Sequence, residues 1–470
     1  MDKKILLINP PLKYRRMRQI LPLGLLNLGT ILRKHGFEIE IVDITAEKPY
    51  DSRFTSDSLT PKEFLQKFKK SNPDIVGLTS VTENYPIAMK IARMCKKENN
   101  DLKIMFGGIH ATFQATECLN NNPFIDIVAL GEAEHIIIDI VKGLMGKIEL
   151  KEVNNIIFKE NGLIKYSQIH LVNDLNKIPL PDLEFIKDKF YPSYSLQVEF
   201  SRGCPFQCAF CSLSPFIEKK VRYFPTKHVV DLLEAYQDLF NNFSFSINDP
   251  LFLLNYKKVE LFLNEVQNRK MELKNWGFQT RVDTINRAIL RKLKKFDANL
   301  ISLGIEDIHN SVLQKIGKQQ NFNQIKNAVK VLKDLNFTVR SNFIIGLPFQ
   351  TKEQMLENID YANQLDLFHF PCLAPFPGSP LFSTPEKFGL TILSKDWELY
   401  TFREIVTDSM VFPIAQQKEI REIAWHKMAQ LYLGKDSTFY HQRKELQHLL
   451  EIGFETWNEE WKQENLTGWN

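Results

Sequence analysis

The chain of 470 residues lacks the features of a membrane protein, an exported protein or a protein with a nucleic-acid-binding tail. Nowhere do about 18 apolar residues follow one another without a charge, so no membrane-spanning helix is predicted. The apolar run at residues 5–8 is far too short for the core of a signal peptide, and we expect a cytoplasmic protein. Lys and Arg number 60 against 56 Asp and Glu, without blocks of like charge, so no nucleic-acid partner is expected.

Internal repeats and low-complexity tracts are also missing, and the composition is that of an ordinary globular protein. Hydrophobic residues make up 44% and charged residues 25% of the chain, which excludes wholesale disorder. The length is typical of about three domains. The 35 Phe residues are not interleaved with Lys and Arg, so we expect them in cores and not in a platform for single-stranded nucleic acid.

Residues 1–145 alternate apolar runs with stretches of helical period. Strands are predicted at 5–8, 39–42, 75–79, 103–106 and 125–130, with helices at 23–35, 62–70 and 85–98. This alternation predicts an α/β domain with a parallel, doubly wound sheet. Ligands of such sheets bind at the carboxyl ends of the strands.

The rest of the chain divides into three further regions. Residues 146–190 contain short alternating strands and a proline-bearing stretch and are interpreted as a linker. Residues 191–385 contain six strand candidates with intervening helices, which favours a partial (β/α)6 barrel over a closed eightfold one. These strands are expected at 196–200, 243–247, 276–280, 300–305, 338–345 and 368–374. Residues 386–470 are predicted to be helical, with helices at 415–433 and 441–452.

Three of the six cysteines lie within eight positions, in Cys204-Pro-Phe-Gln-Cys208-Ala-Phe-Cys211, directly after a predicted strand. Three thiolates on one loop can hold three irons of a [4Fe-4S] cluster and leave the fourth iron open to a ligand. The alternatives are a three-cysteine zinc site or three unrelated buried thiols. A structural zinc site normally has four protein ligands, and no fourth Cys or His lies nearby in the sequence.

This spacing, with the aromatic Phe210 before the last cysteine, resembles the signature of the radical S-adenosylmethionine (SAM) enzymes. The resemblance implies that Cys204, Cys208 and Cys211 are the metal ligands and the core of the catalytic site. It also implies that the amino and carboxylate groups of SAM bind the fourth iron. One electron from the reduced cluster then cleaves SAM to methionine and a 5′-deoxyadenosyl radical. An external one-electron reductant of the flavodoxin or ferredoxin type is therefore expected as a partner.

Three further residues match strand ends that contact SAM in this family. Asp249 closes Ser246-Ile-Asn-Asp249, where the family usually carries two adjacent acids that meet the methionyl amino group; here the first is Asn248. Glu306 ends the fourth strand, where a carboxylate can accept hydrogen bonds from both ribose hydroxyls. Arg281 either pairs with the methionyl carboxylate or braces the barrel. The segments 343–348 and 374–379 resemble the fifth and sixth strand ends near the adenine.

The N-terminal domain resembles the Rossmann-like cobalamin-binding domain that is fused to a large class of radical SAM enzymes. The matching segments are 9–11, 22–28, 77–82, 106–112 and 130–134. The cobalamin contacts that this implies are Thr79, Ser80, Val81, Gly107, Gly108, Gly131 and Glu132. Small strand-end residues allow a bulky corrin to approach the backbone. The alternative is a similar domain that does not bind cobalamin, and a dinucleotide is disfavoured because no GxGxxG follows the first strand.

The Asp-x-His-x-x-Gly motif, which supplies a cobalt-ligating histidine in other cobalamin enzymes, is absent. His110 is therefore interpreted as a hydrogen-bonded histidine at a strand end and not as a cobalt ligand. Only Cys95 and Cys118 precede the three clustered cysteines, too few for the second cluster of the methylthiotransferases, and we expect both to pack as small apolar residues. Cys372 is expected to be a buried barrel thiol.

The resemblance implies a cobalamin-dependent radical SAM methyltransferase that acts on an unactivated carbon, or on phosphorus, in a small molecule, lipid or peptide. In this class one SAM methylates cobalamin and a second supplies the radical that activates the substrate. One alternative keeps both cofactors but forms rings or oxidises tetrapyrroles without methyl transfer. A third possibility is a non-catalytic cobalamin sensor, against which the intact Cys204, Cys208, Cys211 and Glu306 argue.

Overall fold

The computed structural model describes residues 3–13, 20–48, 59–191, 196–217, 219–240, 243–434, 447 and 450–464. The chain forms two compact units. The first comprises the described parts of Met1–Ser195 and Arg222–Leu239, and the second those of Leu196–Val221 and Phe240–Glu464.

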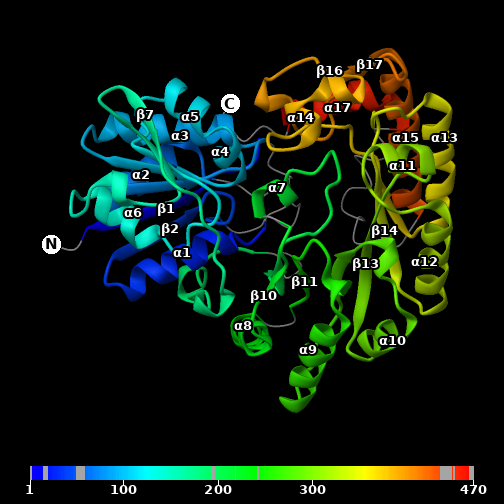
Figure 1. Ribbon diagram of the computed structural model, residues 1–470, viewed down its shortest axis with the longest axis horizontal. Coiled ribbons are helices and arrows are strands. Elements are labelled where there is room, and N and C mark those ends of the chain that lie inside the picture. The colour runs from blue at the N-terminus through cyan, green and yellow to red at the C-terminus, as the bar shows by residue number, and fades with distance from the viewer. Residues whose placement is uncertain are drawn as a thin grey trace. The chain divides into compact units, whose positions relative to one another are not determined.

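The first unit is built on a seven-stranded sheet in the order β2-β1-β3-β4-β5-β6-β7 (Figure 1). Its parallel strands are β1 (Lys4–Asn9), β2 (Glu38–Asp43), β3 (Ile75–Thr79), β4 (Lys103–Gly107) and β5 (Ile127–Ala129). The apolar run Ile5 to Ile8 is buried along its whole length, as expected of a strand covered on both faces. The doubly wound sheet predicted from the sequence is confirmed.

Six described helices of this unit lie between successive strands of its sheet: α1 (Leu23–Lys34), α2 (Pro61–Ser71), α3 (Tyr85–Glu98), α4 (Ile109–Phe113), α5 (Ala115–Asn121) and α6 (Ile137–Leu144). Helix α8 (Thr226–Leu239) also belongs to this unit but comes from a later part of the chain. Helix α1 packs beside α6, and α2 beside α3. Helix α2 begins with a capping box, in which Thr60 and Glu63 each bond the other's backbone N–H.

The region interpreted as a linker, residues 146–190, differs from that expectation. Strands β6 (Ile156–Glu160) and β7 (Leu163–Tyr166) form an antiparallel hairpin that extends the first sheet beyond β5. Residues 156–158 are buried against the sheet, which explains why this hairpin joins the domain. The segment with β10 (Arg222–Tyr223) and α8, expected in the barrel, also belongs to the first unit.

The second unit carries a six-stranded parallel sheet in the order β15-β14-β13-β12-β11-β8. The strands are β8 (Leu196–Val198), β11 (Phe245–Ile247), β12 (Trp276–Thr280), β13 (Ala298–Glu306), β14 (Thr338–Phe343) and β15 (Leu367–His369). Strands β8 and β15 are its two edges, so the barrel is open, as predicted. Phe252, Phe262 and Trp276 are fully buried and their rings pack together. At these positions the prediction that phenylalanine lies in the hydrophobic core is confirmed.

The crossover helices of the barrel are α9 (Tyr256–Asn268), α10 (Arg287–Lys295), α11 (Asn310–Lys315), α12 (Phe322–Asp334) and α13 (Lys352–Tyr361) (Figure 1). Capping boxes start α12, at Asn321 and Gln324, and α13, at Thr351 and Gln354. The short elements β9 (Ser201–Arg202) and α7 (Leu213–Ile217) flank the cysteine loop.

The described C-terminal residues belong to the second unit and contain α14 (Pro380–Ser383), α15 (Ile414–Gly434) and α17 (Phe454–Glu464). The helical region predicted from residue 386 also contains an antiparallel hairpin of β16 (Leu390–Ile392) and β17 (Thr407–Ser409), which was not predicted. Helix α15 matches the helix predicted at 415–433. The one predicted at 441–452 lies largely outside the described residues. Trp425 of α15 packs on Phe454 of α17 with ring centroids 4.5 Å apart.

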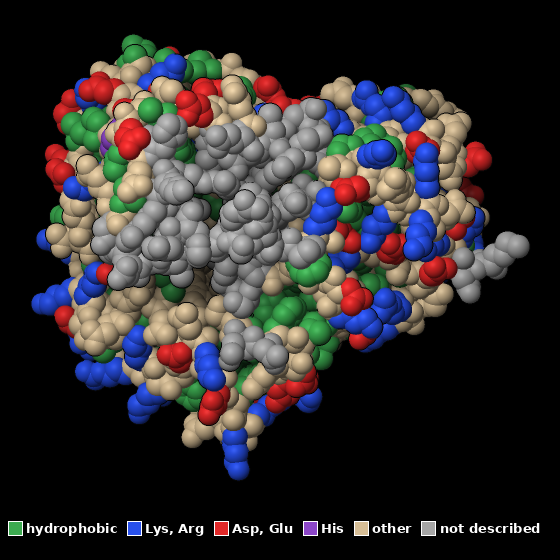
Figure 2. Space-filling view, turned by 180° about the vertical axis from the view of Figure 1, so that it is seen from behind, with side chains coloured by type: hydrophobic (Ala, Val, Ile, Leu, Met, Phe, Trp, Pro, Cys, Tyr) green, Lys and Arg blue, Asp and Glu red, His purple; other side chains and the backbone are tan. Residues whose placement is uncertain are grey.

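Two surface properties bear on the expectations from composition. None of the described helices combines the length and the apolar character needed to cross a bilayer. Figure 2 shows acidic and basic side chains interspersed over the described part of the face in view.

Candidate active site

The cysteine loop starts at a glycine that no other residue could replace without a shift of the backbone. Gly203 has φ +119°, and a Cβ at this position would collide with the carbonyl of Lys220. Cys204 follows directly, and the Cys211 N–H donates to the Cys208 carbonyl at 3.0 Å, closing a turn between these two cysteines. None of the three is in a disulfide, and all three are half-buried.

Two cations adjoin this loop. The Arg281 guanidinium lies 3.7 Å from the centroid of the Phe206 ring, between the first two cysteines. The same group donates to the Lys318 carbonyl at 2.6 Å and to both carboxylate oxygens of Asp283. These contacts are those of a brace, one of the two roles expected for Arg281, and pairing with the methionyl carboxylate stays a prediction.

Lys318 is the second cation, and its side chain connects the loop to the end of β13. Its ammonium group lies 3.0 Å from Oε1 of Glu306 and 5.5 Å from the ring centroid of Phe210. Lys318 is only 5% exposed. An acid and a base are thus placed side by side next to the cysteine loop.

Burial raises the pKa of the Cys204 and Cys208 thiols, since it disfavours the charged thiolate. The positive charges of Lys318 and Arg281 oppose this rise in both pKa values, because they favour the thiolate. The thiolate is the form that binds iron. No three His, Cys, Asp or Glu side chains among the described residues converge as they would around one metal ion. A cluster does not need such convergence, because each thiolate binds a different iron. The donor set therefore fits a [4Fe-4S] cluster.

Asp249 follows β11 and is 1% exposed. Its carboxylate accepts hydrogen bonds from the Phe200 N–H at 2.7 Å and the Ser201 hydroxyl at 2.5 Å. Burial raises its pKa to about 7. Asp249 thus supports the residues that lead into the cysteine loop, and its expected contact with the methionyl amino group stays a prediction. Both of its oxygens already have partners in the barrel.

In the first unit, the residues expected to contact cobalamin lie together at the carboxyl ends of β3, β4 and β5, because these three strands are parallel neighbours. We call this end of the sheet its carboxyl edge. Strand β3 ends at Thr79, which Ser80 and Val81 follow, and β4 ends at Gly107, which Gly108 follows. Gly108 has φ +99°, and a Cβ there would lie 2.5 Å from the Ser80 carbonyl oxygen, so this glycine is required by packing.

Gly107 and Gly131 differ from Gly108 in that they have room around them. The nearest atoms to a Cβ at these positions are 3.7 Å and 4.0 Å away. The missing side chains leave the backbone of this edge open to a ligand, and Val81 beside them is 46% exposed. An edge of this kind fits a large planar cofactor such as a corrin.

Glu132, also expected to contact cobalamin, has a different set of partners. Its carboxylate forms a two-pronged ion pair with Arg222, at 2.6 and 2.9 Å, and accepts a hydrogen bond from the Val172 N–H. Both charged side chains are buried. The ion pair anchors the start of the segment that carries α8 to the first unit, and the expected contact of Glu132 with cobalamin stays a prediction.

A sequence model of the Radical SAM superfamily matches residues 198–362, and one of the B12 binding domain matches residues 18–141. The chain belongs to the cobalamin-binding radical SAM enzymes. The cofactors of this family are the [4Fe-4S] cluster, SAM and cobalamin, as the sequence predicts.

Several relatives within this family are similar over most of the chain. An uncharacterized methyltransferase of Pyrococcus horikoshii is 29% identical over 408 residues, which cover 85% of this chain and 86% of the relative. An anaerobic magnesium-protoporphyrin IX monomethyl ester cyclase of Rubrivivax gelatinosus is 29% identical over 361 residues, or 74% of this chain and 64% of the cyclase.

Among solved structures, the cobalamin-dependent SAM radical enzyme OxsB, with aqua-cobalamin and SAM bound, superposes with a TM-score of 0.74. The match covers 98% of this chain and 72% of OxsB at 16% sequence identity. At that identity, the likeness shows a common fold.

The predicted hydrogen bond of His110 and the predicted burial of the other three cysteines are confirmed, and a role of His110 apart from cobalt stays a prediction. His110 is buried, with Nδ1 3.2 Å from the Thr82 hydroxyl and its ring 4.3 Å from that of Tyr85. Burial lowers the pKa of His110 to about 3, so the ring is neutral at physiological pH. Cys95, Cys118 and Cys372 are all buried.

Sequence reasoning missed Lys318. It is one of 60 basic residues, lies 12 positions after Glu306, and belongs to no motif that we used. The signal that was available is its location between β13 and α12, because the segments that follow the strands of a parallel sheet begin at the carboxyl end, where Glu306 lies. That signal alone does not distinguish Lys318 from its basic neighbour Lys315.

Proposed function

We propose that this protein is a cobalamin-dependent radical SAM methyltransferase that acts on an unactivated carbon, or on phosphorus, of a small molecule, lipid or peptide. The observation that carries the proposal is the cysteine loop with Glu306 and Lys318 beside it, in one chain with an open, glycine-lined edge of a B12-binding sheet. Similarity to the Pyrococcus methyltransferase over 85% of this chain supports methyl transfer.

Cys204, Cys208 and Cys211 would hold the cluster, whose chemistry when bound is the one-electron cleavage of SAM. Glu306 and Lys318 offer opposite charges next to it. The Glu306 carboxylate suits two ribose hydroxyls, and the Lys318 ammonium suits the methionyl carboxylate of SAM. Because Lys318 is buried, its charge acts in a medium of low polarity, where it orients an anionic group strongly.

In this proposal Arg281 and Asp249 do not touch SAM. Arg281 holds the Phe206 side of the cysteine loop against the segment of Lys318, and Asp249 holds the residues that precede the loop. In the first unit, Thr79, Ser80, Val81, Gly107, Gly108 and Gly131 would form the edge that holds cobalamin, which serves as the methyl carrier.

The first experiment is an anaerobic reconstitution with iron, sulfide and hydroxocobalamin, followed by removal of unbound material and measurement of iron, sulfide and cobalt. We expect about four irons and about one cobalt per chain. Four irons without cobalt would refute the methyltransferase proposal, since the methyl carrier would be missing.

Ring formation is the second candidate function, because the Rubrivivax cyclase is among the similar proteins. The second experiment distinguishes it from methyl transfer. A product heavier than the substrate by about 14 Da indicates methylation, and one lighter by about 2 Da indicates ring closure or desaturation. The assay requires a one-electron reductant, for which we propose a flavodoxin or ferredoxin. Failure to cleave SAM in the reconstituted protein would favour a non-catalytic cobalamin sensor.

A further inference from the structure

Glu306 is held in a strained backbone conformation. It is the last residue of β13 and has φ +65°, a region that residues other than glycine rarely adopt. The Asp307 N–H donates to the Ile305 carbonyl at 2.8 Å, which closes a three-residue turn around Glu306. A γ-turn with positive φ is rare and strained, and such strain persists only where the surroundings determine it.

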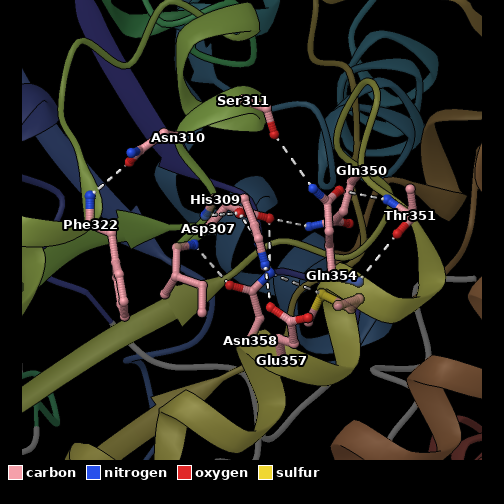
Figure 3. A network of polar contacts seen from close by, with 12 residues as sticks. Asp307, His309, Asn310, Ser311, Phe322, Gln350, Thr351, Gln354, Glu357 and Asn358 are labelled. Atoms are coloured by element: carbon pink, nitrogen blue, oxygen red, sulfur yellow. Dashed lines mark hydrogen bonds and ion pairs between the residues drawn. The ribbon is translucent and has the colours of Figure 1, made fainter.

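Asp307 supplies the first part of these surroundings (Figure 3). It is 0% exposed, and one carboxylate oxygen accepts from the backbone N–H of His309 at 2.6 Å and faces Nδ1 of the His309 ring at 2.9 Å. The other oxygen accepts from Gln350 at 2.7 Å and from Asn358 at 2.8 Å. Four bonds of this kind satisfy a buried carboxylate that would otherwise be very unfavourable.

Gln350 extends these contacts to the next strand end. Its side-chain oxygen accepts from the Gly346 N–H at 2.9 Å, and its nitrogen also donates to the Ile344 carbonyl at 3.1 Å. The Ile344 N–H in turn donates to the carbonyl of Glu306 at 3.0 Å. Gln350 therefore ties the segment after β14 to the turn at the end of β13.

Asn358, on α13, completes the arrangement. While its nitrogen bonds Asp307, its oxygen accepts from the Ile308 N–H at 2.9 Å. Gln350 and Asn358 are both fully buried, so neither can exchange these bonds for water. We call Asp307, Gln350 and Asn358 together the Asp307 clamp.

We infer that the Asp307 clamp is a set of positioning residues for SAM binding. It keeps the strained turn at Glu306 in place, so that the Glu306 carboxylate stays directed to the SAM site beside Lys318 and the cysteine loop. The inference rests on the proposed function, since it assumes that Glu306 binds SAM. None of the three clamp side chains needs to touch SAM for this role.

The test is a double-mutant cycle on SAM affinity, with the anaerobically reconstituted full-length protein. Asp307→Asn keeps the size of the side chain but turns an N–H group toward the N–H donors of the clamp. We expect it to raise the Kd of SAM about tenfold, because the oxygen that is replaced accepts two buried hydrogen bonds and the turn is held less firmly without them. In a Glu306→Gln background the same substitution should have almost no effect on Kd, because its action passes through the Glu306 carboxylate.

Asp366→Asn is the matched control. Asp366 binds the Val339 N–H near the opposite, amino-terminal end of β14, so its loss should lower stability and leave SAM affinity unchanged. Iron content is measured for every variant, to separate SAM binding from cluster loss.

The outcomes distinguish the positioning role of the Asp307 clamp from the assignment of Glu306 to SAM binding. If Asp307→Asn weakens SAM binding equally in both backgrounds, or leaves it unchanged in the wild type, the clamp has no positioning role for Glu306. If Glu306→Gln alone leaves the Kd unchanged, the ribose assignment is wrong and the clamp inference falls with it. Neither result bears on methyl transfer, which product mass tests separately.

Discussion

At the scale of single residues, the site depends on an acid and a base that come from different elements. Glu306 ends β13 and Lys318 follows α11, and their charged groups meet at 3.0 Å in a buried environment. In the interior such a pair is strongly coupled, so removing one partner leaves the other charge uncompensated. Substitutions here should therefore have large effects on ligand binding.

Lys318→Met should weaken SAM binding by about 1–3 kcal/mol, because it removes a charged hydrogen-bond donor while keeping the length of the side chain. Lys318→Arg should recover part of this loss, since it restores the positive charge. The measurement is SAM affinity by equilibrium dialysis of the reconstituted protein. A Kd equal to the wild-type value in the Met variant would remove Lys318 from the SAM site.

His309 should give the protein a pH-dependent stability. Its hydrogen bond to Asp307 raises the pKa of His309 above the ordinary value of 6.5; partial burial opposes the rise and Glu357 adds to it. A histidine with a raised folded-state pKa stabilises the protein fully below the unfolded-state pKa. That stabilisation is lost as the pH rises through the folded-state pKa.

The difference in unfolding free energy between wild type and His309→Gln should therefore be largest below about pH 6.5 and decline above it. Chemical denaturation at a series of pH values measures this difference. A difference that grows with rising pH would contradict the assignment.

At the scale of elements, the cysteine loop depends on how the chain leaves β9. Gly203 combines a positive φ with a close approach of the backbone near Lys220, so two constraints act on one residue. Elsewhere a positive φ occurs without close neighbours, as at Gly389 in the same unit. A comparison of substitutions at the two glycines therefore distinguishes the cost of a positive φ from the cost of a steric clash.

Gly203→Ala should lower the iron content after reconstitution severely, because the added Cβ displaces the backbone that leads into Cys204. Gly389→Ala should cost only the penalty of a left-handed residue, about 1–2 kcal/mol of stability, and retain full iron content. Iron analysis and denaturation curves of both variants test this pair. Full iron content in Gly203→Ala would show that the loop can adjust.

At the scale of the whole molecule, the two cofactor sites lie in units that each have their own sheet and core. The first unit also includes the segment with α8, which follows the cysteine loop in sequence and is anchored through Arg222 and Glu132. Each cofactor should therefore be retained or lost independently of the other.

Cys208→Ala should abolish cluster formation and all turnover, because only two of the three thiolates remain for the cluster. The same variant should still bind about one cobalamin per chain, since its substitution lies outside the first unit. Metal analysis of the reconstituted variant checks both. Loss of cobalt together with iron would contradict independent binding.

The sequence alone determined the family, the cofactors and the fold class. The cysteine spacing and the alternation of strands and helices are local properties, written in neighbouring residues, so they can be read without coordinates. Cys204, Cys208 and Cys211 are recognisable for this reason. The strand ends at Gly107 and Glu306 could also be located, since parallel strands place their ligands at one known edge.

Only the tertiary structure decided which groups meet. Lys318 beside Glu306, Gln350 and Asn358 on Asp307, and Arg222 on Glu132 all join residues far apart in the chain. The structure also shows that Asp249 and Glu132 bond other parts of the protein, which their motifs had not indicated. Such pairs depend on which side chains face one another after folding. A buried charge pairs with a group within hydrogen-bonding distance, and that distance cannot be derived from the number of residues between the two groups.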